Sequence, residues 1–138
     1  MTKMRSYAVL PRALLPRALL LGALLLSGCD SLGLSGTVEV RIQNVSSLLF
    51  TTVSFYAGDE LQTYHDIRAG QGTPYVEAVQ DAYPITTAEV VVEGDTVRLQ
   101  VIDHVGEEPL SGGRYTYMLT VDGPPGSRSL RQQLREDS

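Results

Sequence analysis

The sequence contains no tryptophan, a single cysteine and two histidines among its 138 residues. One cysteine excludes a disulfide within the chain and leaves the thiol free for another role. Long apolar runs are missing as well, since residues 18–26 make an uninterrupted run of only nine Ala, Leu and Gly residues. A helix that crosses a bilayer needs about 20 apolar residues. The composition therefore argues against a disulfide scaffold and against a membrane-spanning helix.

Basic, apolar and small residues follow one another along residues 1–28. Four cations and no acidic side chain precede the apolar run, at Lys3, Arg5, Arg12 and Arg17. A basic start of this kind stays in the cytoplasm while the apolar segment enters the membrane. We therefore interpret residues 1–28 as a signal peptide that is cleaved after export.

The end of this segment reads Leu26-Ser27-Gly28-Cys29. Small Ser27 and Gly28 leave room for a peptidase at the bond before the cysteine, and Leu26 offers it an apolar anchor. The pattern resembles the bacterial lipobox, which implies that Cys29 becomes the mature N-terminus and carries a diacylglyceryl thioether and a further acyl chain. Several chains anchor stably, because each buried methylene contributes about 0.8 kcal/mol. The alternative is an ordinary secretory peptide with an incidental cysteine.

Residues 29–36 form a short tether rich in Ser, Gly and Leu. The seven residues after Cys29 reach at most about 25 Å. Asp30 resembles the signal that retains lipoproteins at the inner membrane of some bacteria, although an outer-membrane location stays open. We expect three parts: a signal peptide at 1–28, a lipidated tether at 29–36 and one domain at 37–138, on the exported side of the cell membrane or the outer membrane.

The mature chain is strongly acidic. It holds seven arginines and no lysine against sixteen acidic residues, a net charge of −9. Nucleic acid is excluded as a partner on this ground. Anionic headgroups are repelled too, which argues that the acyl chains hold the protein at the membrane and that no basic patch assists.

The domain shows the two-residue period of β-strands. Strands are expected at residues 37–44, 48–57, 61–68, 75–79, 114–121 and 129–135, the last as an edge strand rather than a helical turn. Residues 86–93 and 96–103 predict a hairpin around Gly94-Asp95. In the third segment Leu61, Thr63, His65 and Ile67 share one face. The predicted core comprises Val38, Val40, Ile42, Val53, Phe55, Val90, Val92, Val97, Leu99, Val101, Tyr115, Tyr117, Leu119 and Val121.

This spacing favours an all-β fold, a small antiparallel β-sandwich of about 7–8 strands and immunoglobulin-like size. A small barrel is the alternative. Residues 102–117 read Ile-Asp-His-Val-Gly-Glu-Glu-Pro-Leu-Ser-Gly-Gly-Arg-Tyr-Thr-Tyr. Their Gly-Glu-x-Pro-Leu loop before a Tyr-Thr-Tyr strand resembles a family of small bacterial lipoproteins of unknown function. The resemblance implies export and an all-β fold, and it transfers no catalytic residue.

Two sets of residues bear on metal or acid–base chemistry. His65-Asp66 and Asp103-His104 together offer two imidazoles and two carboxylates to a metal. Neighbouring side chains of a strand point to opposite faces, however, which favours solvated rim residues. Paired acids at Asp59-Glu60 and Glu107-Glu108 lie in expected turns. We therefore predict no metal and no cofactor apart from the covalent lipid on Cys29.

The remaining candidates suit binding. Tyr64, Tyr75 and Tyr83 offer amphipathic rings for a contact patch, or else they cover the core with their hydroxyls in water. The loop at residues 106–113, with Gly106, Glu107 and Pro109, is the candidate recognition loop. The sequence thus predicts a membrane-anchored envelope lipoprotein that binds a protein or a glycan without catalysis. The alternative is a metal-dependent or carboxylate-based envelope enzyme.

Overall fold

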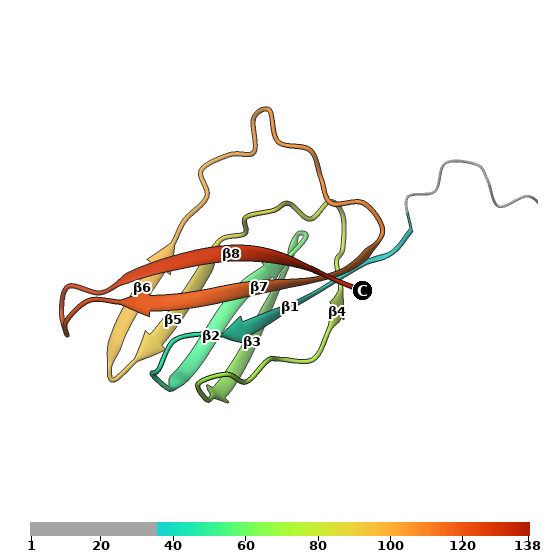
Figure 1. Cartoon of the computed structure of the whole chain (residues 1–138). Helices are drawn as coiled ribbons and strands as arrows, with labels where there is room; N and C mark the ends of the chain where they lie inside the picture. Colours follow the sequence, from blue (N-terminus) through green and yellow to red (C-terminus); the bar gives the residue numbers. More distant parts are fainter. Residues whose placement is uncertain (1–35) are drawn as a thin grey trace, which may run out of the picture. The chain divides into compact units, whose positions relative to one another are not determined.

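A computed structural model describes residues 36–138, and these residues form an all-β domain of eight strands (Figure 1). The strands are β1 (Val38–Asn44), β2 (Phe50–Ala57), β3 (Glu60–Ile67), β4 (Val76–Glu77), β5 (Ala88–Val92), β6 (Asp95–Leu99), β7 (Gly113–Asp122) and β8 (Ser129–Asp137). Within this range no helix is long and apolar enough to cross a bilayer. The predicted signal peptide, Cys29 and Asp30 lie outside the described residues.

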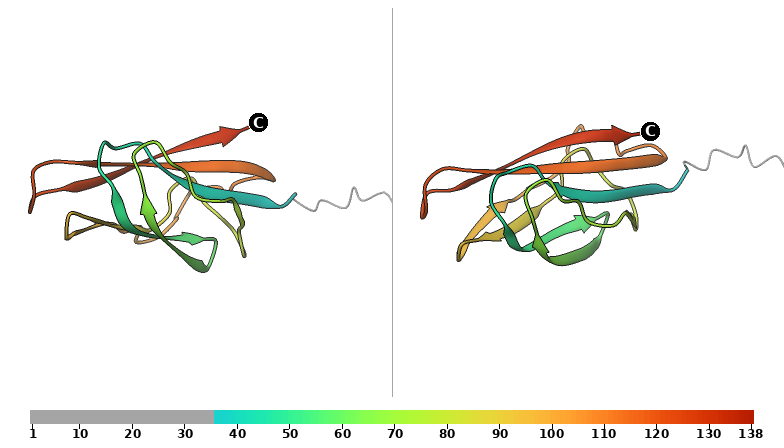
Figure 2. Two further views of the ribbon diagram at one scale, coloured as in Figure 1. Left: turned by 90° about the horizontal axis from the view of Figure 1, so that it is seen from below. Right: turned by 60° about the horizontal axis from the view of Figure 1, so that its bottom comes forward.

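The strands form two four-stranded sheets that face each other. One sheet has the order β4-β1-β7-β8 and the other β3-β2-β5-β6, and Figure 2 shows them as two layers. The predicted β-sandwich is confirmed, with β8 at a sheet edge as expected. One strand pair departs from the antiparallel prediction, because β1 and β7 run parallel from Val38↔Gly113 to Asn44↔Leu119. The chain visits the second sheet between these two strands, so no tight turn imposes an antiparallel direction on them.

The core lies between the sheets and consists of the inward-facing residues of seven strands. Val40, Ile42, Val53, Phe55, Val90 and Leu119 are fully buried. Phe55 of one sheet meets Tyr117 of the other edge to face, with ring centroids 6.3 Å apart. The Tyr117 hydroxyl donates a hydrogen bond to the Tyr83 carbonyl oxygen at 2.7 Å, which satisfies the one polar atom of this buried ring. Burial raises the pKa of Tyr117.

The predicted hairpin is confirmed, but its turn and its second strand differ from the expectation. Val92 pairs with Asp95, so the turn residues are Glu93 and Gly94, with φ of 48° and 85°. Two positive φ angles match the right-handed twist of the strands, as in a type I′ turn. Strand β6 ends at Leu99. Val101, predicted in the core, lies half-buried in the loop that follows, where its N–H donates to Thr87 Oγ1 at 3.0 Å.

The prediction of one shared face in the third strand is wrong. Leu61, Thr63 and His65 point to solvent, whereas Ile67 is buried. The change of face occurs at Asp66, whose φ of 56° interrupts the extended backbone and its alternation. Strand β2, which pairs with β3, changes face at the same position. Phe50 and Val53 are three positions apart, so strict alternation would place them on opposite faces, yet both are buried.

Candidate functional site

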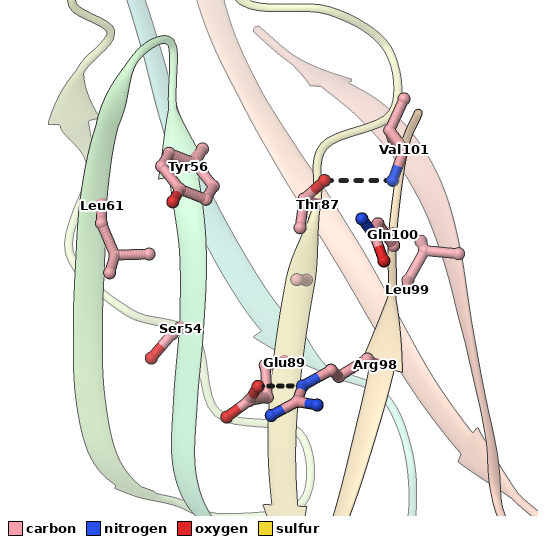
Figure 3. Close-up of a pocket in the computed structure, with 10 residues that line it drawn as sticks. Ser54, Tyr56, Leu61, Thr87, Glu89, Arg98, Leu99, Gln100 and Val101 are labelled. Carbon is pink, nitrogen blue, oxygen red and sulfur yellow. Dashed lines mark hydrogen bonds and ion pairs between the residues drawn. The ribbon is translucent and has the colours of Figure 1, made fainter. Parts of the chain in front are cut away.

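A groove of about 350 Å³ opens on the outer face of the sheet β3-β2-β5-β6 (Figure 3). We call it the outer-face groove. Its walls come from all four strands of the sheet and from the chain that leaves β6. The lining residues are Ser54, Tyr56, Leu61, Thr87, Ala88, Glu89, Arg98, Leu99, Gln100 and Val101.

Strand alternation places the apolar part of the groove on the solvent side. Phe55 points into the core, so its neighbour Tyr56 must point outward. The register of β2 and β3 sets Tyr56 opposite Leu61. These side chains are 41% and 54% exposed, values high enough for both to contact a ligand without rearrangement of the core.

The polar part of the groove comes from the hairpin of β5 and β6. Glu89 lies opposite Arg98 in the register, and Arg98 Nε donates a hydrogen bond to Glu89 Oε2. Beyond Leu99 the Gln100 side chain stands at the edge of the groove (Figure 3). The bond from the Val101 N–H to Thr87 Oγ1 holds this exit segment beside β5. Charged and amide groups therefore stand beside an aromatic and an aliphatic side chain.

The lining of the groove suits binding better than catalysis. Ser54 Oγ shares a hydrogen bond with Thr63 Oγ1 at 3.0 Å, and no histidine or cysteine belongs to the lining. A nucleophilic serine needs an adjacent base. A shallow surface of tyrosine, leucine, amide and ion pair instead fits a ligand with both apolar and hydrogen-bonding parts, such as a glycan or an extended peptide.

The three predicted tyrosines lie at separate places. Tyr64 faces the core, where its ring stacks on Phe55 with centroids 6.3 Å apart, and burial raises its pKa. Tyr83 stacks on His104 with centroids 3.9 Å apart. Tyr75 lies on the outer face of the other sheet. None of the three lines the outer-face groove, and each has a packing role of its own.

Tyr75 belongs to a cluster around Asp137, the last residue of β8. The Tyr75 hydroxyl donates to Asp137 Oδ2 at 2.7 Å, and Arg135 Nε donates to Oδ1 at 2.8 Å. Thr116, which is fully buried, also donates to this carboxylate and accepts a bond from Arg41 Nε at 2.8 Å. Burial alone would raise the pKa of Asp137, but the bonds from Thr116, Arg135 and Tyr75 outweigh burial and lower it to about 2.

This cluster secures the C-terminal strand. The guanidinium carbons of Arg41 and Arg114 lie 4.5 and 5.0 Å from the centroid of the Tyr75 ring. The ring is thus in contact with two cations. A cationic and carboxylate-centred network of this kind ties the segment before β4 to β1, β7 and β8.

The predicted recognition loop projects from the domain between β6 and β7 (Figure 1). Gly106, Glu107 and Pro109 are exposed. Glu107 Oε2 lies 3.1 Å from His104 Nδ1, so this part of the predicted site pairs with a histidine of the same loop.

The two histidines have different surroundings. His65 Nδ1 lies 3.3 Å from Thr52 Oγ1 on the outer face of the second sheet, whereas His104 contacts Tyr83 and Glu107. Across residues 36–138, no three His, Cys, Asp or Glu side chains come close enough to hold a metal ion.

Sequence reasoning missed Tyr56 and Leu61. Tyr56 follows the core residue Phe55 in β2, so alternation directs its ring to solvent. An aromatic side chain on the solvent face of a strand is the sequence signal that could have identified this site. The sequence pattern places Leu61 on the same strand face as Ile67. The positive φ of Asp66 puts the two side chains on opposite faces of β3, and alternation alone does not predict that change.

The described residues thus define a small all-β sandwich domain with an open groove on one sheet. No protein-family model matches the sequence, and no curated protein matches it. One solved structure, of a protein from Eubacterium rectale, is similar with a TM-score of 0.50 at 11% sequence identity, covering 70% of this chain and 87% of that one. A second, described as a "putative cell adhesion protein" from Bacteroides uniformis, has a TM-score of 0.39 at 15% identity and covers 72% of this chain and 50% of that one. The first similarity supports the fold alone.

Proposed function

We propose that this chain is a bacterial envelope lipoprotein whose β-sandwich is a non-catalytic binding module. In this proposal Cys29 carries the lipid that holds the domain at the exported face of the cell membrane or the outer membrane. The acidic mature chain supports anchoring through acyl chains rather than through a basic surface.

The outer-face groove is the observation that carries the binding role. Tyr56 and Leu61 are more than two fifths exposed and adjacent, and the Glu89–Arg98 pair and Gln100 provide hydrogen-bonding groups beside them. The partner is an envelope protein or a glycan. The tether of seven residues keeps this partner within about 25 Å of the lipid surface plus the length of the domain.

The polar groups of the domain support binding over catalysis. His65 contacts Thr52 and His104 contacts Glu107, and neither the described histidines nor the paired acids line the groove with Ser54 and Thr87. A hydrolase with a side-chain nucleophile needs a base within hydrogen-bond reach of that nucleophile and a position for the reacting atom about 3 Å from both the nucleophile and the oxyanion donors.

Lipidation is tested by labelling producing cells with a clickable palmitate analogue. We expect label on the wild-type protein and none on Cys29→Ala, with the variant recovered as a soluble or unprocessed form. Unlabelled wild-type protein would contradict the lipoprotein assignment.

The groove is tested by photo-crosslinking in intact cells. In the test variant a photoreactive residue replaces Leu61, which lines the groove and is 54% exposed. In the control it replaces Leu49, which is 43% exposed and immediately precedes the first residue of β2, away from the groove. We expect a defined crosslinked species from position 61 alone, and its loss when Tyr56→Ala is added. Identical species from both positions, or none from position 61, would refute a partner in this groove.

A further inference from the structure

Two apolar side chains project into solvent from the loop between β6 and β7. Ile102 is 92% exposed and Val105 is 86% exposed, far above the 54% of Leu61. We call this pair the loop tip. Exposure of two β-branched side chains three positions apart on one loop costs solvation free energy, because each would gain from burial.

Polar contacts hold the backbone of the same segment. Asp103 Oδ1 accepts a hydrogen bond from the Val105 N–H at 3.0 Å, and the ring of His104 stacks on Tyr83. The Glu107 N–H donates to the His104 carbonyl oxygen at 3.0 Å, which closes a turn. These contacts hold the backbone so that the apolar side chains face outward.

The loop returns to the domain beside the tether. Gly112, at the end of the loop, lies against Gly36, since a Cβ built on Gly112 would be 2.5 Å from the Gly36 Cα. The Gly113 N–H donates to the Thr37 carbonyl oxygen at 3.0 Å. In Figure 1 the end of the loop, where the chain enters β7, lies beside the start of β1. The chain that leads to Cys29 therefore leaves the domain at the base of this loop.

We propose that the loop tip is a second membrane contact, which inserts Ile102 and Val105 into the lipid surface to which Cys29 is anchored. The proposal rests on the lipidation of Cys29. The tether from Cys29 to Gly36 is at most about 25 Å long, so the end of the domain that carries the loop must stay near the lipid. Anchoring orients that end, and the tip gives it apolar side chains to bury in the acyl boundary.

The charges of the loop select the kind of lipid. Asp103, Glu107 and Glu108 accompany the tip, and they repel anionic headgroups within about a Debye length of 8–10 Å. The contact therefore favours zwitterionic lipid and weakens when anionic lipid is added at low salt. With the acyl chains on Cys29 already providing affinity, the tip mainly sets the orientation of the outer-face groove relative to the membrane.

The absence of tryptophan from the sequence provides a clean measurement. Full-length lipidated protein carrying Val105→Trp is reconstituted into phosphatidylcholine vesicles with and without brominated acyl chains. The matched control is Val45→Trp, because Val45 is 43% exposed and follows β1 at the opposite end of that strand from the tether. Ile102→Trp is a second reporter in case the first variant folds poorly.

We expect the Val105→Trp emission to be quenched by the brominated lipid and shifted to shorter wavelength, whereas the Val45→Trp emission is unchanged. Adding Ile102→Asp to Val105→Trp should reduce the quenching, and phosphatidylglycerol should reduce it at low salt. Protein that sediments with vesicles while both reporters remain unquenched would overturn the tip contact alone, and would leave the tip as a surface for a protein. Protein that remains in the aqueous phase would overturn both the anchor and the tip contact.

Discussion

Asn44 is the buried polar residue whose removal should most weaken the domain. It is fully buried at the end of β1. Its Nδ2 donates to the carbonyl oxygens of Leu48 and Ile67 at 2.7 and 2.9 Å. Its Oδ1 accepts from the N–H and the hydroxyl of Ser46 at 3.0 and 2.7 Å. One side chain thus connects the end of β1, the loop before β2 and the end of β3.

The magnitude follows from these four bonds. A net contribution of about 0.5–1.5 kcal/mol each gives about 2–6 kcal/mol for Asn44→Ala. The bonds to Ser46 and to the Ile67 carbonyl oxygen are buried, whereas the bond to the Leu48 carbonyl oxygen is partly buried, so water can partly satisfy that oxygen in the variant. We therefore expect a loss of about 3 kcal/mol in the free energy of unfolding. A domain of this size has about 5–15 kcal/mol in total.

The assay is urea unfolding of residues 30–138, followed by far-ultraviolet circular dichroism because the chain has no tryptophan. The midpoint should fall while the slope stays constant, which marks a change in stability alone. Gln43→Ala is the control, since the Gln43 side chain makes only exposed bonds, one to the Gly70 carbonyl oxygen at 3.3 Å and one from Arg135 Nη1 at 3.2 Å, and it should cost less than about 1 kcal/mol. Equal losses in the two variants would refute the argument from buried hydrogen bonds.

Three further predictions concern other parts of the sandwich. Arg128→Met should lower the free energy of unfolding by about 2 kcal/mol in the same urea assay, because the Arg128 side chain is 4% exposed and its guanidinium bonds the Val92 carbonyl oxygen and the Glu93 carboxylate. The control Arg98→Met should cost almost nothing, because the Arg98 side chain is 69% exposed. The folded pKa of Asp137 is about 2, below the unfolded value of about 3.9, so wild-type stability should decline as pH falls from about 4 to 2. Asp137→Asn should lack this decline in acid titrations. Gly58→Ala should lower the melting temperature more than Gly94→Ala, since both have positive φ but only a Cβ at Gly58 overlaps a carbonyl oxygen.

The sequence alone determined the strands and most of the core. Alternation between apolar and polar residues depends on a period of two that every extended backbone shares, so the inward faces of β1 and β7 could be assigned without a partner. The hairpin of β5 and β6 was equally predictable, because a glycine-containing turn between two β-prone segments is a local signal. The acidic balance of residues 29–138 and the lipobox-like segment are likewise properties of sequence.

The tertiary structure decided the features that depend on which segments meet. The parallel pairing of β1 with β7 joins residues about 75 positions apart, and no local pattern specifies that direction. Thr116 sits on the outward face of β7, where alternation predicts exposure, yet it is fully buried beneath Arg41, Arg135 and Asp137. The outer-face groove arises in the same way, since Glu89 and Arg98 reach the side of Tyr56 only through the pairing of β2 with β5. The two-residue period of the sequence predicts which face of its strand a side chain occupies, whereas the packing of distant strands determines what covers that face.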